Sequence, residues 1–293
     1  MFTAYYSIFG NMGLNFIKRI TQIRNTLNVF SKRIDDDKGI KVYQFYHEHL
    51  FTNPKYQSPK KLSRHEYQVF SQNGEDGIIQ EIFNRIGYTN KYFIEFGVEN
   101  GLECNTLNLL HKGWSGLWID GSVDYYKQIT TRFANFIKES RLKVKQSFIT
   151  AENIESLFDE ASSPKEPDLL SIDIDYNDYH VWKAITQYKP RAVIIEYNSI
   201  FRPDTNFVVK YNPTRVWDGS CHFGASLLAL EQLGLEKGYC LVGCVFTGSN
   251  AFFVRQDLVA DLFEAPFTAE NHYEPNRDYL NYRPGHPKNH IPD

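Results

Sequence analysis

Cysteine is scarce in this sequence, and its spacing excludes small proteins stabilised by disulfides or by zinc. The 293 residues include only Cys104, Cys221, Cys240 and Cys244. They form neither paired Cys-x2-Cys units nor a dense framework of the kind that small secreted domains use. We therefore expect four reduced thiols in a cytoplasmic protein.

Long apolar runs and an excess of positive charge are missing as well. The segment 1–20, MFTAYYSIFGNMGLNFIKRI, interrupts its apolar stretch with Gly and Asn and places its positive charges after it. That pattern fits neither a secretory signal nor a membrane-spanning helix. The formal net charge is −3, so no overall basic field would attract nucleic acid. We expect no spanning segment and no nucleic-acid partner.

What is present is the composition of an ordinary folded protein. Apolar residues make up 42% and charged residues 23% of the chain, which argues against disorder. The length allows one large core with an appended element. Aromatic residues reach 15%, a share that suits pockets for flat or sugar-like ligands but is explained equally well by an aromatic core.

The N-terminal part predicts a helix that is separate from the main domain. Apolar residues recur at helical spacing over 12–34, with Lys and Arg between them. This amphipathic helix could cover the core, form a homodimer contact or attach to a membrane surface. The polar run 52–65, with Pro54 and Pro59, indicates a linker. We therefore expect a helical extension and linker over 1–65.

From residue 66 the pattern alternates between strand and helix. Apolar runs separated by helices imply parallel strands that are covered on both faces. The last two runs are joined by Thr247-Gly248-Ser249, which indicates an antiparallel hairpin. We expect an α/β fold over 66–260, a Rossmann-like, doubly wound and mostly parallel sheet that ends in this hairpin, with a tail over 261–293. The expected strands are 92–98, 116–121, 143–150, 168–175, 191–198, 239–246 and 250–255, and the expected helices are 75–87, 103–112, 123–138, 151–161, 178–187 and 224–237.

The turn after the first expected strand is acidic. Gly97 and Gly101 would let the backbone approach a ligand closely, and Glu95, Glu99 and Glu103 surround the turn. A dinucleotide loop needs G-x-G-x-x-G and a helix start free of negative charge, because it holds a pyrophosphate. Three carboxylates repel phosphate but tolerate a sulfonium and an α-amino group. The turn therefore favours S-adenosylmethionine over NAD, although a glycine-rich structural turn would look similar.

Polar residues at the next two strand ends support a nucleoside site. Asp120 ends the second strand about 20 residues beyond the turn, where an acidic side chain accepts hydrogen bonds from a ribose. It could also cap the helix that begins near Val123. Gln146, Ser147 and Phe148 end the third strand, where they suit an adenine. The expected cofactor-binding residues are Gln72, Glu95, Gly97, Asn100, Gly101, Asp120, Ser122, Ser147, Phe148 and Asp173.

Six segments in this order resemble the FkbM-like S-adenosylmethionine-dependent methyltransferases. They are SQNGEDGII (71–79), FIEFGVENG (93–101), GWSGLWIDGS (113–122), LLSIDIDYNDY (169–179), HFGAS (222–226) and NAFFVR (250–255). The resemblance implies O-methylation of hydroxyls on sugars, glycans or polyketide-linked sugars, and places Gln72 and the turn 74–76 near the cofactor. One departure is Tyr176, which stands where this family usually has glycine and would reshape the pocket.

Carboxylates gather at the ends of the fourth and fifth expected strands. Asp173 and Asp175 lie on the same side by strand alternation, and Glu196 and Asn198 end the neighbouring strand about 5 Å away. Oxygen ligands of this kind suit Mg²⁺ with open positions for substrate. We expect Asp173 and Glu196, with Asp175 or Asn198, to bind the ion, and the acceptor hydroxyl to bind to it.

A metal-free alternative uses the same edge of the sheet. Lys210, Arg202 and Arg215 could neutralise the carboxylates, and His222 would then be the general base because its pKa lies near neutrality. Asp173, Glu196, Lys210 and His222 are therefore the candidate catalytic residues. The loop 199–221 is too long for a plain connector and predicts either a lid over the acceptor or a structural loop.

Two other functional classes remain open. An NAD-dependent oxidoreductase would keep the same sheet, although the acidic turn opposes it. A non-catalytic nucleotide-binding or scaffold protein is the reading if the carboxylates only cap helices. The favoured interpretation is methyl transfer to the hydroxyl of a saccharide or related small molecule.

Overall fold

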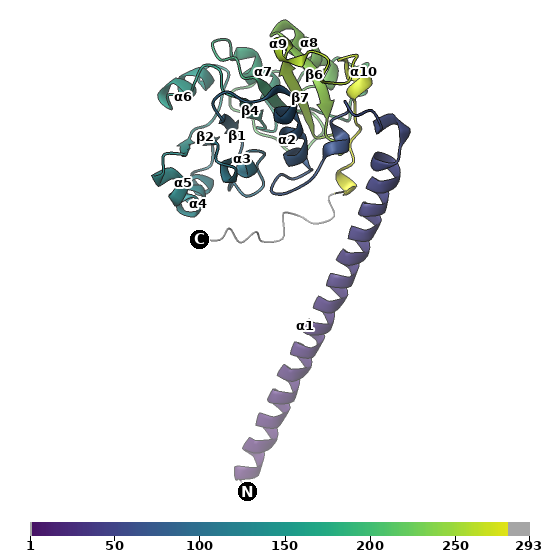
Figure 1. The fold of residues 1–293 in the computed structure, drawn as a ribbon. Coiled ribbons are helices and arrows are strands. Elements are labelled where there is room, and N and C mark those ends of the chain that lie inside the picture. The colour runs from purple at the N-terminus through teal and green to yellow at the C-terminus, as the bar shows by residue number, and fades with distance from the viewer. Residues whose placement is uncertain (1, 281–293) are drawn as a thin grey trace. The chain divides into compact units, whose positions relative to one another are not determined.

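A computed structural model describes residues 2–280 of the chain, with side chains from Lys18 onward. The chain divides into two compact units, Met1–His49 and Leu50–Asp293. The first unit is a single helix, α1 (Phe2–Tyr46), which continues into a π-helical turn at His47–Phe51 (Figure 1). Within residues 2–280, no helix combines the length and the apolar character that crossing a membrane requires.

The helix α1 is longer than the sequence pattern predicts. The expected range 12–34 covers only the part with regular apolar spacing, whereas the helix runs over Phe2–Tyr46. No proline occurs before Pro54, so nothing removes a backbone donor or forces the chain out of the helix. The periodic pattern therefore located the helix but underestimated its length.

A seven-stranded sheet forms the centre of the second unit. Its strands are β1 (Tyr92–Phe96), β2 (Ser115–Asp120), β3 (Leu142–Gln146), β4 (Leu169–Ile172), β5 (Ala192–Glu196), β6 (Tyr239–Cys244) and β7 (Asn250–Arg255). Their order is β3-β2-β1-β4-β5-β7-β6. The first five are parallel, and β7 pairs antiparallel with both β5 and β6. This is the expected Rossmann-like, doubly wound sheet with a C-terminal antiparallel hairpin.

Helices connect the strands around the sheet (Figure 1). They are α2 (Glu75–Ile86), α3 (Leu107–His111), α4 (Val123–Arg132), α5 (Ala134–Lys138), α6 (Ile154–Glu160), α7 (Asp178–Ala184), α8 (Leu227–Glu236), α9 (Gln256–Val259) and α10 (Ala269–His272). The 3-10 turns are Pro54–Tyr56, Ser63–His65 and Asp278–Leu280. The helix expected over 123–138 is two helices separated at Phe133, whose ring is buried edge-on against Trp118.

Two apolar cores cover the two faces of the sheet. Successive residues of a strand point to opposite faces, and accordingly Phe93 belongs to one core and Ile94 to the other. The core of Phe93 includes Ile78 of α2 and Leu107 of α3. The core of Ile94 includes residues of α6, α7 and α8. Since both faces are covered, a ligand would bind at the ends of the strands.

Segments outside the expected domain 66–260 also pack into this unit. Leu50, Tyr56 and Leu62, from the predicted extension and linker over 1–65, are almost fully buried. The Tyr56 hydroxyl lies 2.8 Å from both carboxylate oxygens of Glu274, which belongs to the predicted tail. Part of that tail, 281–293, lies outside the described residues.

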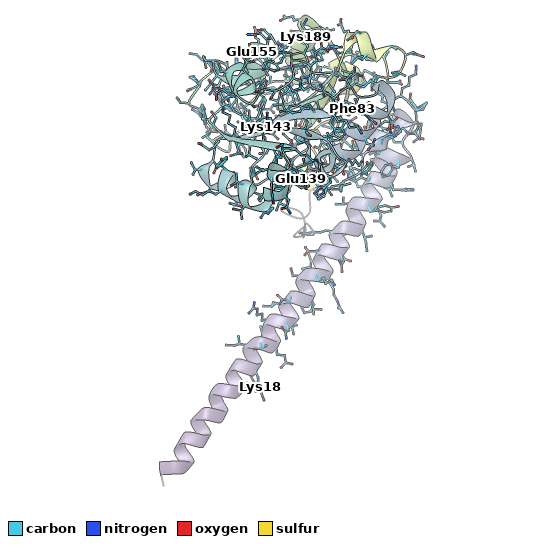
Figure 2. All side chains as sticks on the ribbon, turned by 60° about the vertical axis from the view of Figure 1, so that its left-hand side comes forward. Lys18, Phe83, Glu139, Lys143, Glu155 and Lys189 are labelled. Atoms are coloured by element: carbon cyan, nitrogen blue, oxygen red, sulfur yellow. The ribbon has the colours of Figure 1, made fainter. Side chains whose placement is uncertain are left out.

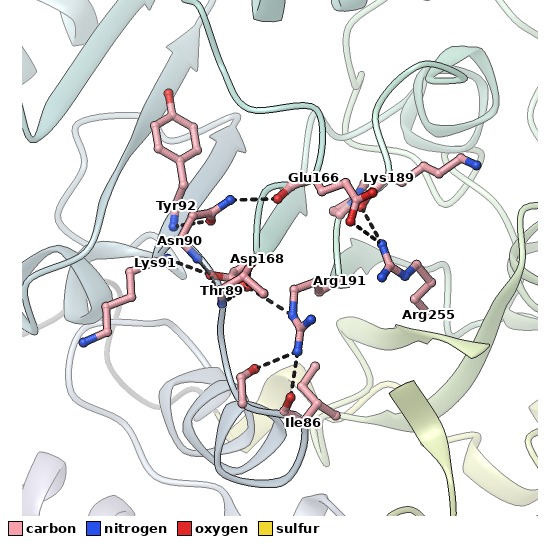
Figure 3. Close-up of polar contacts among 12 residues, drawn as sticks. Ile86, Thr89, Asn90, Lys91, Tyr92, Glu166, Asp168, Lys189, Arg191 and Arg255 are labelled. Atoms are coloured by element: carbon pink, nitrogen blue, oxygen red, sulfur yellow. Dashed lines mark hydrogen bonds and ion pairs between the residues drawn. The ribbon is translucent and has the colours of Figure 1, made fainter. Parts of the chain in front are cut away.

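A buried ion pair ties the strands together at the edge where they begin (Figure 3). Asp168, directly before β4, is completely buried and accepts backbone hydrogen bonds from Thr89, Asn90 and Lys91 at 2.7–3.0 Å. Arg191, directly before β5, lies 3.2 Å from Asp168 and donates to the carbonyl of Ile86 at the end of α2. This network is structural, and it leaves the opposite edge as the place for chemistry.

Candidate active site at the carboxyl edge of the sheet

A cavity of about 540 Å³ opens where the parallel strands end. The order of the strands reverses between β1 and β4, and ligands of doubly wound sheets bind at this switch point. Segments following β1, β2, β3 and β4 line the cavity, together with the end of β5 and the start of β7. The loop between β5 and α8 contributes Arg215 and Val216, and the start of α2 contributes Gln72 and Glu75.

The lining is acidic. Eight carboxylate residues and one arginine line the cavity, and the described residues place no lysine or histidine there. The carboxylates are Glu75, Glu95, Glu99, Glu103, Asp120, Asp173, Asp175 and Glu196, and the cation is Arg215. Such a lining favours a cationic or metal-bound ligand over a phosphate.

Gly97 permits the tight turn after β1. Its φ is +78°, a conformation that favours glycine, and its N–H donates to the carbonyl of Ile119. A Cβ at this position would lie 1.4 Å from the carbonyl oxygen of Asp173. The turn and the segment that carries Asp173 therefore touch backbone to backbone.

Gly101, in contrast, does not line the cavity. Its φ is +77°, and a Cβ there would meet the rings of Phe133 and Trp118 at 2.8 Å. This glycine lets the end of the turn pack on the core beneath it. We therefore assign it no contact with a ligand, although the sequence analysis counted it among the binding residues.

Glu95 caps the start of the helix that follows the turn. Its two carboxylate oxygens accept hydrogen bonds from the backbone N–H groups of Asn105 and Thr106, at 2.8 and 3.0 Å. The hydroxyl of Ser171 donates to the same carboxylate at 3.1 Å. Burial raises the pKa of Glu95, and these donors lower it in part. The two N–H groups directly before α3 are thus occupied by a carboxylate.

Asp120 holds the turn after β1 next to the segment that follows β2. One of its oxygens accepts from the N–H of Glu99 at 2.8 Å, and the other accepts from the N–H of Ser122 at 2.7 Å. The Ser122 side chain, rather than Asp120, caps α4 by accepting from the N–H of Tyr125. Asp120 still lines the cavity, and burial raises its pKa.

Glu99 adds another carboxylate to the cavity, between Asp120 and Asp175. It has a φ of +50° and lines the cavity. Burial raises the pKa of its carboxyl, and the neighbouring charges of Asp175, Glu103 and Asp120 raise it further. A cation bound between these groups would relieve their mutual repulsion.

Three carboxylates converge beyond β4 and β5. One oxygen from each of Asp173, Asp175 and Glu196 lies within 4.8 Å of the other two. Burial and the charges of Asp178 and Asp175 hold the pKa of Asp173 well above its ordinary value. Burial and the charge of Asp173 do the same to Glu196, whose Oε2 atom is buried without a hydrogen-bond donor. The cluster has the donor set and the unsatisfied oxygen that suit a hard divalent cation.

Asp178 supports this cluster from the start of α7. It accepts a hydrogen bond from the N–H of Ile174 at 2.8 Å, which holds the turn that carries Asp173 and Asp175. Burial raises the pKa of Asp178 to about 6, although backbone donors lower it in part. Asp178 does not line the cavity, so we treat it as a positioning residue.

Asn198, Lys210 and His222 do not line the cavity. The Asn198 amide donates to the carbonyls of Cys221 and Phe223, and its oxygen accepts from the N–H of Ile200. Lys210 and His222 are exposed, and the His222 ring lies edge-on to Phe207. The alternation that pairs positions 196 and 198 fails because β5 ends at Glu196 and the chain then turns away.

The long loop between β5 and α8 reaches the cavity through Arg215 and Val216 only. The Arg215 guanidinium lies 5.7 Å from the centre of the Tyr176 ring. Tyr176 is buried under this loop and does not line the cavity. Tyr176, which was expected to reshape the pocket, therefore supports the loop instead.

Asn250 is the lining residue that the sequence analysis missed most clearly. It opens β7 directly opposite Glu196, and its amide donates to Glu75 at 2.9 Å. Its Oδ1 atom is buried without a donor. A polar residue at the start of the antiparallel strand that adjoins β5 was the available signal. The other lining residues that were not predicted are Val98, Cys104, Asn105, Gly121, Tyr125, Ile149, Ile174, Asn177 and Val216.

Comparisons with known proteins give likenesses in structure alone. No family model matches the sequence, and no curated protein sequence matches it. A putative O-methyltransferase from Klebsiella pneumoniae is 12% identical, with a TM-score of 0.45 over 76% of this chain and 99% of the other. The magnesium protoporphyrin IX methyltransferase of Synechocystis, with bound SAH, is 11% identical, with a TM-score of 0.42 over 62% and 81% of the two chains. An S-adenosylmethionine-dependent methyltransferase from Clostridium acetobutylicum is 12% identical, with a TM-score of 0.37 over 60% and 89%. The function of the chain must therefore be argued from the cavity itself.

Proposed function

We propose that this chain is an S-adenosylmethionine-dependent O-methyltransferase that acts on a hydroxyl of a sugar, glycan or related small metabolite. The observation that carries the proposal is the capping of the helix start after β1 by Glu95. A pyrophosphate beside this helix start would meet the Glu95 carboxylate, whereas a sulfonium donor has no phosphate to place there. An NAD-dependent oxidoreductase is therefore disfavoured by a specific contact.

The lining residues suggest one orientation for the donor. The Asp120 carboxylate would accept hydrogen bonds from the ribose hydroxyls, and Ser147 and Phe148 would contact the adenine. Glu99, Asn100 and Gln72 would surround the amino-acid end, where the carboxylate of Glu99 attracts the α-ammonium group. The donor methyl would then point toward the cluster of Asp173, Asp175 and Glu196.

We further propose that Asp173, Asp175 and Glu196 hold a divalent cation such as Mg²⁺. Three crowded carboxylates repel one another, and the unpartnered Oε2 of Glu196 offers a ligand atom. When bound, the cation would polarise the acceptor hydroxyl and lower its pKa. These residues would position the acceptor beside the donor methyl, and Arg215 would line the cavity from the loop between β5 and α8.

The transfer is a single displacement. The acceptor oxygen forms a bond to the methyl carbon while the bond from that carbon to sulfur breaks, and its electron pair stays on sulfur, which becomes a neutral thioether. Without the cation, the hydroxyl proton would pass to a carboxylate oxygen of Asp173 or Glu196, whose raised pKa suits this role. Alignment of the three reacting atoms supplies much of the acceleration.

Calorimetric titration tests the donor assignment. We expect S-adenosylmethionine and S-adenosylhomocysteine to bind and NAD not to bind. Asp120→Ala should weaken donor binding about 10- to 100-fold, because it removes charge-assisted hydrogen bonds to two hydroxyls. Asp124→Ala is the matched control, since Asp124 is an exposed aspartate of the same segment with a side chain 86% exposed. Tight binding of NAD without binding of the sulfonium compound would overturn the proposal.

Removal of divalent ions by chelation tests the proposed cation independently of the methyl donor. Full turnover after rigorous removal of divalent ions would eliminate the proposed cation and leave a carboxylate base alone. Turnover retained by Asp173→Ala would instead indicate that the carboxylate cluster only supports the fold.

The free thiols of all four cysteines support a reducing compartment such as the cytoplasm.

A further inference from the structure

The helix α1 carries an exposed apolar stripe. Ile20, Ile23, Leu27, Phe30 and Ile34 follow one another at alternating intervals of three and four residues, and each is 50–61% exposed. Residues at this spacing lie on one face of a helix. The unit Met1–His49 is one helix, so it offers no second element that could bury this stripe.

The stripe is bordered by positive charge. The segment 1–34 contains five basic residues and no aspartate or glutamate, and Asp35, Asp36 and Asp37 directly follow it. At about 100° per residue, Arg19 and Arg33 flank one side of the stripe and Arg24 flanks the other. Long basic side chains can lie along an apolar surface while their charged ends reach outward. Figure 2 shows Lys18, another of the five, on α1.

A second copy of the helix is a poor occupant for this stripe. The spacing places Ile20, Leu27 and Ile34 at one core position of a heptad and Ile23 and Phe30 at the other. In a parallel pair, Arg19 of one copy would face Arg24 of the other. An antiparallel pair would bring Arg24 opposite Arg24 and Arg19 opposite Arg33. Each of these pairings would place like charges next to each other, and this repulsion disfavours association of two helices.

We propose that α1 binds in the plane of a membrane that contains anionic lipid. The five apolar side chains would enter the boundary between headgroups and acyl chains, and Arg19, Arg24 and Arg33 would lie among the negative headgroups. Basic residues at both borders of an apolar face are the pattern that such in-plane helices use. Attachment would concentrate the second unit at a surface without any part of the chain crossing it.

Vesicle co-sedimentation of the full chain tests this proposal. We expect binding to vesicles of phosphatidylcholine with about 30% phosphatidylserine, and binding at least tenfold weaker to phosphatidylcholine alone. The variant Arg19→Gln/Arg24→Gln/Arg33→Gln should lose about 100-fold in affinity for the anionic vesicles, from about fivefold for each charge. Leu27→Asp should weaken binding as well, because it places a charge in the stripe.

The matched control carries the same change of net charge on the second unit. Lys127, Lys138 and Lys189 are exposed there, and Figure 2 labels Lys189. Lys127→Gln/Lys138→Gln/Lys189→Gln should bind the anionic vesicles as the parent does, and both triple variants should keep donor affinity in calorimetry without vesicles.

Three results would overturn the proposal. The first is equal binding to neutral and anionic vesicles or to neither. The second is an equal loss in the control variant. The third is a dimer in sedimentation velocity that Leu27→Asp dissociates while vesicle binding is unchanged, since a second copy would then cover the stripe.

Discussion

Glu196 shows how a single side chain can be costly for folding and useful for chemistry. One of its carboxylate oxygens is buried, and the pKa values of Glu196 and of the neighbouring Asp173 are held well above the ordinary value. A carboxyl whose pKa is raised in the folded state contributes stability below its unfolded pKa, and that contribution is lost as the pH rises through the folded value. Asp178, with a pKa of about 6, shows the same behaviour between roughly pH 4 and pH 6.

We predict that Glu196→Gln stabilises the chain at pH 8 and not at pH 4. A tenfold change in proton affinity corresponds to about 1.4 kcal/mol, which is about 2–4 °C in Tm for a domain of this size. Mg²⁺ should raise the Tm of the parent at pH 8 and leave the variant nearly unchanged, and turnover should fall. Thermal denaturation at the two pH values, with and without Mg²⁺, measures these effects. A variant that is destabilised at pH 8 would contradict the described crowding.

At the scale of elements, the two edges of the sheet have separate tasks. The edge where the strands begin is tied together by Asp168 and Arg191, and the edge where they end carries the cavity. Loss of one partner leaves an uncompensated buried charge. Stability and ligand binding can therefore be changed independently.

We predict that Asp168→Ala destabilises the chain by about 3–5 kcal/mol in urea denaturation. It removes the acceptor for three backbone donors as well as the partner of Arg191. Glu166→Gln is the matched control, because Glu166 pairs with Arg255 at 2.9 Å with a side chain 63% exposed. It should cost about 0–1 kcal/mol. Equal losses in the two variants would show that the buried pair has no special role.

The order and type of the elements could be predicted from the sequence, because buried parallel strands form short apolar runs that helices separate. The bounds were harder. The helix expected over 103–112 occupies only Leu107–His111, since residues 100–106 form a loop whose N–H groups bind Glu95. A carboxylate that caps a helix ten residues away leaves no periodic signal.

The candidate site was predictable where residues directly follow strands and less so where loops turn. Asp120, Asp173 and Glu196 line the cavity because strand ends meet at one edge. Lys210 and His222 were placed by sequence distance alone, and the path of the long loop keeps both outside the cavity. Asn250 required knowledge that β7 pairs with β5, which the sequence does not state.

At the scale of the whole molecule, every residue that lines the cavity belongs to the unit Leu50–Asp293. We therefore predict that a chain consisting of residues 50–293 folds and binds S-adenosylmethionine within about threefold of the parent affinity, a difference below 1 kcal/mol. Calorimetry and circular dichroism of the shortened chain measure this. The same chain should lose vesicle binding. A loss of donor affinity would indicate that the helix contributes to the site.

The close contact between Gly97 and the carbonyl of Asp173 joins the donor end and the carboxylate end of the cavity. The turn that receives the methyl donor cannot shift without moving the backbone beside the carboxylate cluster. Ligands at the two places would thus report on each other, and equilibrium thermodynamics makes their cooperativity reciprocal. The factor by which the cation raises the affinity for the donor must equal the factor by which the donor raises the affinity for the cation.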